Sequence, residues 1–351
     1  MKQVKVWHFS ILATGLLSLA AVAPVTAATC DRACLKGFAD QLLASIVARD
    51  VTKLPLAKVY AATENSVPSA LGMMVVWRTA TAAKSNYYVI DPQSQQVFLI
   101  STVSEGPNDT LLFGRLKIQN SLISEIELYT SRSRGQSGFQ FSPNALANMP
   151  KAWTVAVPPE RRASRAALLQ AGRSIFDTAV KAPDIGAGCV LYENGKVVAE
   201  NAEVAKSVAP TDQPGAKPAA NNAAASNADG TVPIPCGNPP IRPTDKNART
   251  DIIDEEQGIV VSIAIVNGVA EPYLVTNPTE SAFVPNSMLQ PFTDMLKKQQ
   301  ASGKFTAPAV RPMPASQVVA ELHRVYDGKL QGLMMLQSSG ATGSSSPWVA
   351  R

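Results

Sequence analysis

Histidine chemistry in this chain depends on a single residue. The sequence holds two histidines, His8 and His323, and His8 lies in an N-terminal segment that we expect to be removed. An imidazole exchanges protons near neutral pH, so His323 is a candidate general acid or base. It precedes Val325 by two residues on an alternating strand, which turns both side chains toward the interior. The alternative is a buried histidine that only satisfies a neighbouring polar group.

Two carboxylates recur at matched places. Glu64 precedes Asn65, and Glu193 precedes Asn194. In a pocket, Glu193 and Glu64 would be catalytic bases beside His323, and the amide of Asn194 would orient a ligand. The structural alternative is that both asparagines adopt the positive φ of tight hairpin turns.

Three aromatic residues are the candidate ligand contacts. Tyr87 and Tyr88 are neighbours on a predicted strand, so they point to opposite faces and one of them can line a pocket. A tyrosine hydroxyl can donate a hydrogen bond to a developing oxyanion. Trp77 would place its ring near the pocket mouth. Ordinary packing within a strand is the alternative for all three.

Several other classes of site are disfavoured because their patterns are missing. No CxxC or HExxH spacing occurs, so we expect no metal site. Neither a Walker A sequence nor GxGxxG occurs, and we expect no cofactor. The net charge is +5, with 17% charged residues and no dense basic run, which does not favour nucleic acid as a partner.

Residues 1–28 have the pattern of a secretory signal peptide. Lys2 and Lys5 precede an apolar run over about 9–22, and Ala27-Ala28 offers small residues for cleavage. A membrane anchor is the alternative, but the run is short for a membrane span. We therefore expect a secreted or periplasmic protein with no stable membrane insertion after cleavage.

All four cysteines follow this segment: Cys30, Cys34, Cys189 and Cys236. An even number of cysteines in an oxidising compartment indicates two disulfides, and the sequence leaves three pairings open. We expect Cys30 and Cys34, at the start of a helix, to connect that helix to the second half of the chain. A reactive thiol pair is the alternative.

The order of predicted elements occurs twice along the chain. Each copy begins with an amphipathic helix, over 34–47 and 166–180, and continues with several strands joined by turns. The offset between equivalent points grows from 129 (Glu64 to Glu193) to 163 (Asp91 to Asp254), because the second copy contains insertions. This pattern predicts a tandem duplication of an α+β unit.

The expected organisation is a first domain over 29–150, a linker over 151–162 and a second domain over 163–351. Residues 203–235 are rich in Ala, Pro, Asn and Asp without apolar periodicity, which predicts a disordered insertion. Residues 277–314 contain apolar residues at helical spacing, which predicts a helical insertion over a pocket or a sheet edge.

These elements resemble a family of secreted fungal and bacterial proteins of unknown function with tandem nuclear-transport-factor-2-like (SnoaL-like) domains. The residues that carry the resemblance are Cys30 to Leu35, Thr63-Glu64-Asn65, Arg115 to Ile118, Cys189 with Tyr192 to Gly195, and Ser346-Pro347-Trp348. The resemblance implies two cone-shaped domains, each with an N-terminal helix packed on a curved antiparallel sheet. It also implies pairing of the domains through their sheets, and hence a monomer with an intramolecular pseudo-dimer.

The functional expectation is an exported protein that binds a small apolar or aromatic molecule in a cone pocket. Cofactor-independent acid-base chemistry of the lyase or isomerase type would then involve His323, Glu193 and Glu64. The alternative is a non-catalytic binding or envelope-interaction module, because a fold does not transmit a function.

Overall fold

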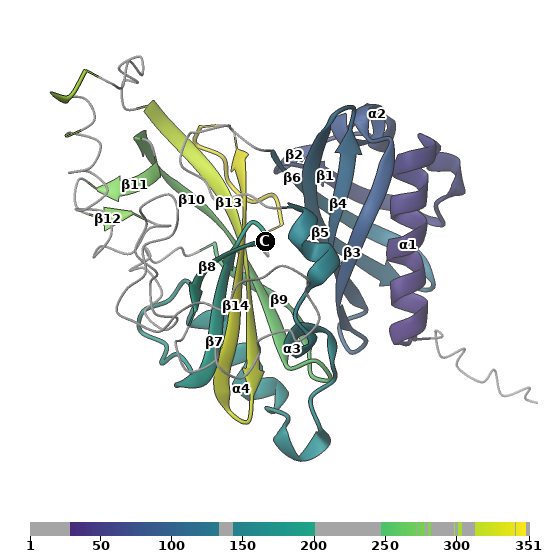
Figure 1. Ribbon diagram of the computed structural model, residues 1–351. Helices are drawn as coiled ribbons and strands as arrows, with labels where there is room; N and C mark the ends of the chain where they lie inside the picture. Colours follow the sequence, from purple (N-terminus) through teal and green to yellow (C-terminus); the bar gives the residue numbers. More distant parts are fainter. Residues whose placement is uncertain are drawn as a thin grey trace, which may run out of the picture.

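The computed structural model describes residues 29–132, 143–200, 247–271, 273–277, 280–281, 298, 301–303, 313–340 and 342–348. Within them the chain forms an α+β structure with a six-stranded and an eight-stranded sheet. Figure 1 shows the two sheets side by side, with the long helix α1 on the outer side of the first. Among the described helices, none has the length and apolar character to cross a bilayer. The predicted signal peptide, the 203–235 insertion and most of the 277–314 insertion lie outside the described residues.

The first half contains the helices α1 (Arg32–Ala48) and α2 (Val75–Thr79), with short turns of 3-10 helix at η1 (Val51–Lys53) and η2 (Leu71–Met73). Its strands are β1 (Leu56–Glu64), β2 (Val67–Pro68), β3 (Ala82–Asp91), β4 (Gln96–Glu105), β5 (Asn108–Gln119) and β6 (Leu122–Arg132). They are ordered β2-β1-β6-β5-β4-β3 across the sheet.

The connection and the second half follow. They contain η3 (Pro143–Asn148), α3 (Lys151–Thr154), η4 (Pro159–Arg161) and α4 (Arg165–Arg173). The strands are β7 (Ile185–Glu193), β8 (Lys196–Glu200), β9 (Arg249–Asp254), β10 (Ile259–Glu271), β11 (Tyr273–Asn277), β12 (Glu280–Ser281), β13 (Met313–Tyr326) and β14 (Lys329–Gly340). Their order is β12-β11-β10-β13-β14-β7-β8, with β9 also paired to β10.

The two sheets share one connectivity. In each, the first strand lies between a short hairpin partner and the last strand, and the remaining strands form an antiparallel meander. The expectation of purely antiparallel sheets is wrong in one respect, because β1 is parallel to β6 and β7 is parallel to β14. The reason is the strand order, since the last strand of each meander lies beside the first strand and runs in the same direction.

Local sequence explains why α1 forms where the apolar spacing predicted it. The carboxylate of Asp31 caps its first turn by accepting a hydrogen bond from the backbone N–H of Cys34 at 2.8 Å. The helix ends where Arg49 adopts a left-handed φ of 56°. Its buried face packs on the first sheet and comprises Leu35, Phe38, Ala39, Leu42, Leu43 and Ile46. The corresponding helix α4 begins after Ser164 and ends at Arg173, so it is shorter than predicted.

The inner faces of the two sheets share a single apolar core. Trp153 of α3, within the predicted linker, lies fully inside it and meets the ring of Tyr192 edge-on at 5.9 Å. The core joins Tyr87, Val89, Phe98, Ile100, Leu111, Phe113 and Tyr129 of the first sheet to Ile252, Ile259, Val261, Ile263, Val318, Leu322 and Met334 of the second. The two halves therefore contact each other through the sheet faces that their helices leave open.

A pair of reciprocal ion pairs also joins the halves. Arg32, the first residue of α1, donates to both carboxylate oxygens of Asp254 at 2.8 and 2.9 Å. Arg165, the first residue of α4, donates to both carboxylate oxygens of Asp91 at 3.0 and 2.7 Å. Each aspartate is fully buried and also accepts a backbone N–H from the opposite half. The helix start of each half is thus tied to a strand end of the other.

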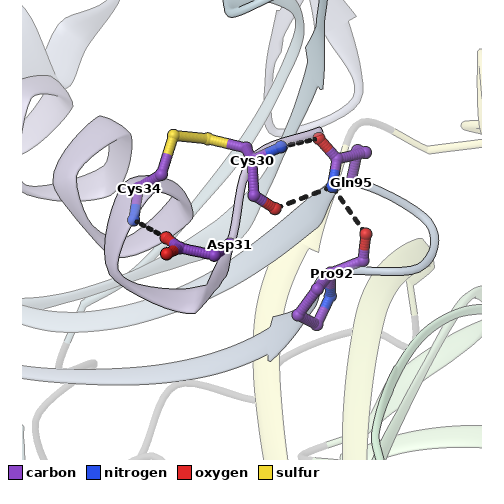
Figure 2. Close-up of a disulfide and its surroundings, with 5 residues drawn as sticks. All are labelled: Cys30, Asp31, Cys34, Pro92 and Gln95. Atoms are coloured by element: carbon purple, nitrogen blue, oxygen red, sulfur yellow. Dashed lines mark hydrogen bonds between the residues drawn. A yellow bond between two sulfur atoms is a disulfide. The ribbon is translucent and has the colours of Figure 1, made fainter. Parts of the chain in front are cut away.

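Figure 2 shows a disulfide between Cys30 and Cys34, at the start of α1. The expectation that these cysteines connect the helix to the second half is wrong. Cys30 lies just before the helix cap, where the chain turns, and the two Cα atoms are 5.3 Å apart, within the normal range for a disulfide. The side-chain amide of Gln95 accepts a hydrogen bond from the backbone N–H of Cys30 and donates one to the carbonyl oxygen of Cys30. Cys189 is also disulfide-bonded, and its partner lies outside the described residues.

Candidate functional site

The outer face of the second sheet contains a buried polar site. On β13, side chains alternate so that Val318, Ala320 and Leu322 enter the core between the sheets, while Val319 and Val325 pack under the α4 side. Glu321 and His323 follow the second set and face the helix side. The side chain of His323 is 3% exposed and that of Glu321 is fully buried.

These two side chains form a dyad. Nε2 of His323 lies 3.0 Å from Oε1 of Glu321. In the neutral tautomer with the proton on Nε2, the Nε2–H group donates a hydrogen bond to the carboxylate. The neutral ring then presents Nδ1 as an acceptor. Nδ1 is buried and has no hydrogen-bond partner within the described part of the chain. A carboxylate that orients an imidazole in this way leaves the second nitrogen ready to take a proton from a ligand.

The first half shows what this face looks like without such a dyad. The strand registers place His323 opposite Val260 and Leu333, and Leu116 opposite Val97 and Ile126. Leu116 is therefore the counterpart of His323 and lies in an apolar cluster under α1.

The same correspondence makes Gly114 the counterpart of Glu321, and Leu99 that of Ser262. At each of these positions the second half carries a polar group, and its helix is 9 residues long against 17 in the first half. The first half carries Leu116, Gly114 and Leu99 at these positions, and the second half carries His323, Glu321 and Ser262.

Other polar groups lie on the same face. Glu193 of β7 faces outward with Leu191 and accepts a hydrogen bond from Gln337 Nε2 at 3.3 Å. The side-chain carbonyl oxygens of Gln337 and Gln317 are buried without a hydrogen-bond partner in the described ranges. Nε2 of Gln337 also lies 3.0 Å from the sulfur of Met335, and Leu191 and Leu333 belong to an apolar cluster on the same face. Of the predicted residues, the structure thus brings His323 and Glu193 to one face.

The other predicted carboxylate lies in the first half and has a structural partner. Glu64 accepts hydrogen bonds from the backbone N–H groups of Val75 and Val76, at 2.7 and 2.9 Å, and so caps α2. Asn194 occupies a turn with a φ of 45°, and its Oδ1 accepts the backbone N–H of Gln337 at 2.9 Å. Neither group is brought to His323.

The predicted aromatic contacts lie inside packed layers. Trp77 is buried under α1, in a short helix rather than the strand predicted for it, because Glu64 caps that helix. Tyr88 donates to Asp40 of α1 at 2.5 Å. Tyr87 lies between the sheets and donates to the carbonyl of Trp153 at 2.6 Å. Burial raises the pKa of the Tyr87 hydroxyl well above its usual value, which keeps it a neutral donor.

A charged cluster that we did not predict joins the inner faces of the two sheets. Glu127 of β6 accepts from Arg115 Nε at 2.6 Å and from Arg249 Nη2, of the second half, at 2.6 Å. Tyr129 also donates to Glu127. Glu125 also pairs with Arg115, at 2.7 Å, so two carboxylates balance the two arginines, and the Glu127–Arg249 contact links the halves. The glutamate of the dyad was missed as well, although the Glu-x-His spacing on a strand puts both side chains on one face.

Among the described histidines, cysteines and carboxylates, no group of three or more has an arrangement that could hold a metal ion. Comparison with protein-family models and with curated protein sequences finds no match to this chain.

Proposed function

We propose that this chain is an exported protein that binds a small, mainly apolar molecule against the outer face of the second sheet. The observation that carries the proposal is the unpartnered, buried Nδ1 of His323, with the opposite ring nitrogen held by Glu321. A buried polar atom without a partner is unfavourable by about 1–3 kcal/mol. A ligand hydroxyl or amide that donates to Nδ1 would remove this cost.

The same geometry suits cofactor-independent acid-base chemistry of the lyase or isomerase type. Nδ1 would take a proton from a ligand O–H or activated C–H, and the imidazolium would be stabilised by Glu321. In an isomerisation the same proton returns to another atom of the ligand. Glu193, on the same face, is the second carboxylate within this proposal, and a non-catalytic binding module is the alternative.

The remaining expectations belong to this proposal. Two disulfides favour an oxidising compartment, and hence export. The shared connectivity and the reciprocal Arg–Asp pairs support a tandem duplication whose copies form a pseudo-dimer within one monomer. A helix packed on each sheet is compatible with the nuclear-transport-factor-2-like cone, which we retain as a proposal.

The test uses the fact that residues 29–351 contain one histidine. In a protein labelled with ¹⁵N-histidine and lacking residues 1–28, imidazole NMR reports the two nitrogens of His323 alone. We expect a neutral ring protonated on Nε2. Native mass spectrometry of the purified protein should show a bound small molecule, and its removal should shift the Nδ1 signal.

His323→Leu is the matched variant, since Leu116 fills the equivalent position of the first half. It should fold and lose the bound molecule. Leu116→Val, in the apolar layer under α1, is the control and should retain it. The proposal fails if the wild-type protein carries no ligand and the Nδ1 signal is unaffected by a panel of apolar alcohols and ketones.

A further inference from the structure

A cavity lined by neither His323 nor Glu321 lies where the first half meets the C-terminal segment. It is a groove of about 660 Å³ between the β1–β2 hairpin and the C-terminal segment. This volume lies within the range of small-molecule sites. Two aromatic residues (Tyr60, Trp348), two prolines (Pro68, Pro347), two hydroxyl residues (Thr63, Ser69) and three alanines line it.

The indole of Trp348 is fixed in this groove. Its Nε1–H donates to Thr63 Oγ1 at 2.9 Å, and its backbone N–H donates to Ser346 Oγ at 3.2 Å. The guanidinium of Arg115 lies 4.8 Å from the ring centre, and Glu127 in turn holds that guanidinium. Trp348 lines the groove and is only half-buried, and Arg115 is not a lining residue. The ring is thus immobilised before any ligand arrives, which reduces the entropy cost of binding.

The chemistry of the lining restricts the ligand. None of the lining residues, all of them within the described ranges, carries a charge, so an uncharged ligand fits best. The indole N–H already donates a hydrogen bond to Thr63, so it cannot donate one to a peptide carbonyl. Grooves that bind proline-rich peptides use an aromatic lining with such donors. What remains is ring surface on Trp348 and Tyr60, with hydroxyls and backbone groups between them.

We infer that this groove binds a neutral carbohydrate, with a sugar ring stacked on Trp348. The C–H face of a pyranose matches an aromatic surface, and its hydroxyls match Ser69 and the backbone of the β1 edge. Tyr60 is 39% exposed and supplies a second ring for an adjoining sugar unit. This site is independent of the dyad at His323, and its ligand is an oligosaccharide rather than a small apolar molecule.

Titration of the full chain with cellohexaose, maltohexaose and chitohexaose tests the inference, by calorimetry and by tryptophan fluorescence. We expect saturable binding of at least one hexasaccharide. Trp348→Ala should weaken it at least tenfold, Trp348→Phe should retain most of it, and Tyr60→Ala should weaken it several-fold. Tyr326→Ala, at an aromatic residue that does not line the groove, is the control and should leave binding unchanged.

Three results would overturn the inference. The first is no binding of any hexasaccharide by the wild-type protein. The second is equal binding by the wild-type protein and by a folded Tyr60→Ala or Trp348→Ala variant. The third is competition by decaproline at a lower concentration than any sugar, which would assign the groove to a peptide. If Trp348→Ala fails to fold, Tyr60→Ala still tests the inference. The Tyr60 side chain makes no hydrogen bond with another described residue, so its removal should leave the fold intact.

Discussion

The reciprocal ion pairs permit a quantitative test of how the halves are held together. We predict that Arg32→Met and Arg165→Met each lower the free energy of unfolding by about 3 kcal/mol. Removing one partner of a buried ion pair leaves an uncompensated charge, at a cost of about 3–5 kcal/mol. Both aspartates are fully buried, but the arginine side chains are 27% and 28% exposed, which favours the lower end.

The two variants should have equal effects, because their geometry is equivalent. Lys36→Met is the matched control. Lys36 pairs with Asp40 at 2.7 Å, as close as the arginines lie to their partners, but both side chains are about half exposed. Exposed pairs at this helical spacing contribute about 0.3–0.5 kcal/mol. The control should therefore change stability only within that range.

The assay is equilibrium unfolding in urea, followed by tryptophan fluorescence and by circular dichroism. Both probes should give one coincident transition in every variant, because the halves share a core. Two outcomes contradict the reasoning. A loss below about 1 kcal/mol in either arginine variant would mean that its aspartate is not desolvated. A second transition in Arg32→Met alone would mean that the halves unfold independently.

Three further predictions concern pH, capping and packing. Burial alone would raise the pKa of Asp91, but hydrogen bonds from Arg165 and from backbone N–H groups outweigh it and lower the pKa. A carboxylate whose pKa is lower in the folded than in the unfolded state stabilises the folded protein at pH values above its unfolded-state pKa. This stabilisation is lost as the pH falls through the folded-state pKa. The urea midpoint should therefore drop on acidification, and it should drop less in Asp91→Asn. Glu64→Ala removes the cap of α2 and should lower the free energy of unfolding by about 1 kcal/mol. Urea unfolding measures this loss, and Glu64→Gln is the control. In Gly172→Leu the new side chain would meet β9 and β10, since even a Cβ lies 2.6 Å from the nearest side-chain atom. A loss of several kcal/mol is expected, and an unchanged melting temperature would contradict this.

Local features of the fold were predictable from the sequence. The apolar spacing and Asp31 located α1, and asparagine in tight turns located the hairpins at Asn65 and Asn194, where φ is positive. The repeated order of elements also matches the shared connectivity of the two sheets. These features depend on interactions between residues close in sequence, which is why short patterns reveal them.

Long-range features were not predictable. The parallel pairing of β1 with β6 joins segments about 65 residues apart, and no local pattern encodes it. Arg32 and Arg165 occupy equivalent positions at the starts of their helices, but the aspartate that each one pairs with lies in the opposite half. The sequence of one half alone therefore does not reveal these ion pairs. Strand packing, the alternative considered for Trp77, is wrong, because its segment is a short helix capped by Glu64, eleven residues before the start of that helix.

Some features of the candidate site were likewise predictable from the sequence, and others were not. His323 was recognisable as a single histidine on an alternating strand, and Glu321 was recognisable from its spacing but was overlooked. The absence of a partner for Nδ1 in the described structure depends on what packs over the face, which only coordinates reveal. The role of Trp348 depends on a contact with Thr63, some 285 residues away in sequence.

The crossed Arg–Asp pairs also determine when this protein can finish folding as it is made. Asp91 leaves the ribosome long before Arg165, and Arg32 long before Asp254. A chain extended only to the end of the first sheet therefore holds a carboxylate whose cation does not yet exist, beside an apolar face with nothing to cover it. Until β9 is available, the first half lacks residues that cover its inner face in the folded chain, Ile252 among them. Synthesis that stalls before that point would leave a product for proteases and chaperones rather than a stable half-molecule.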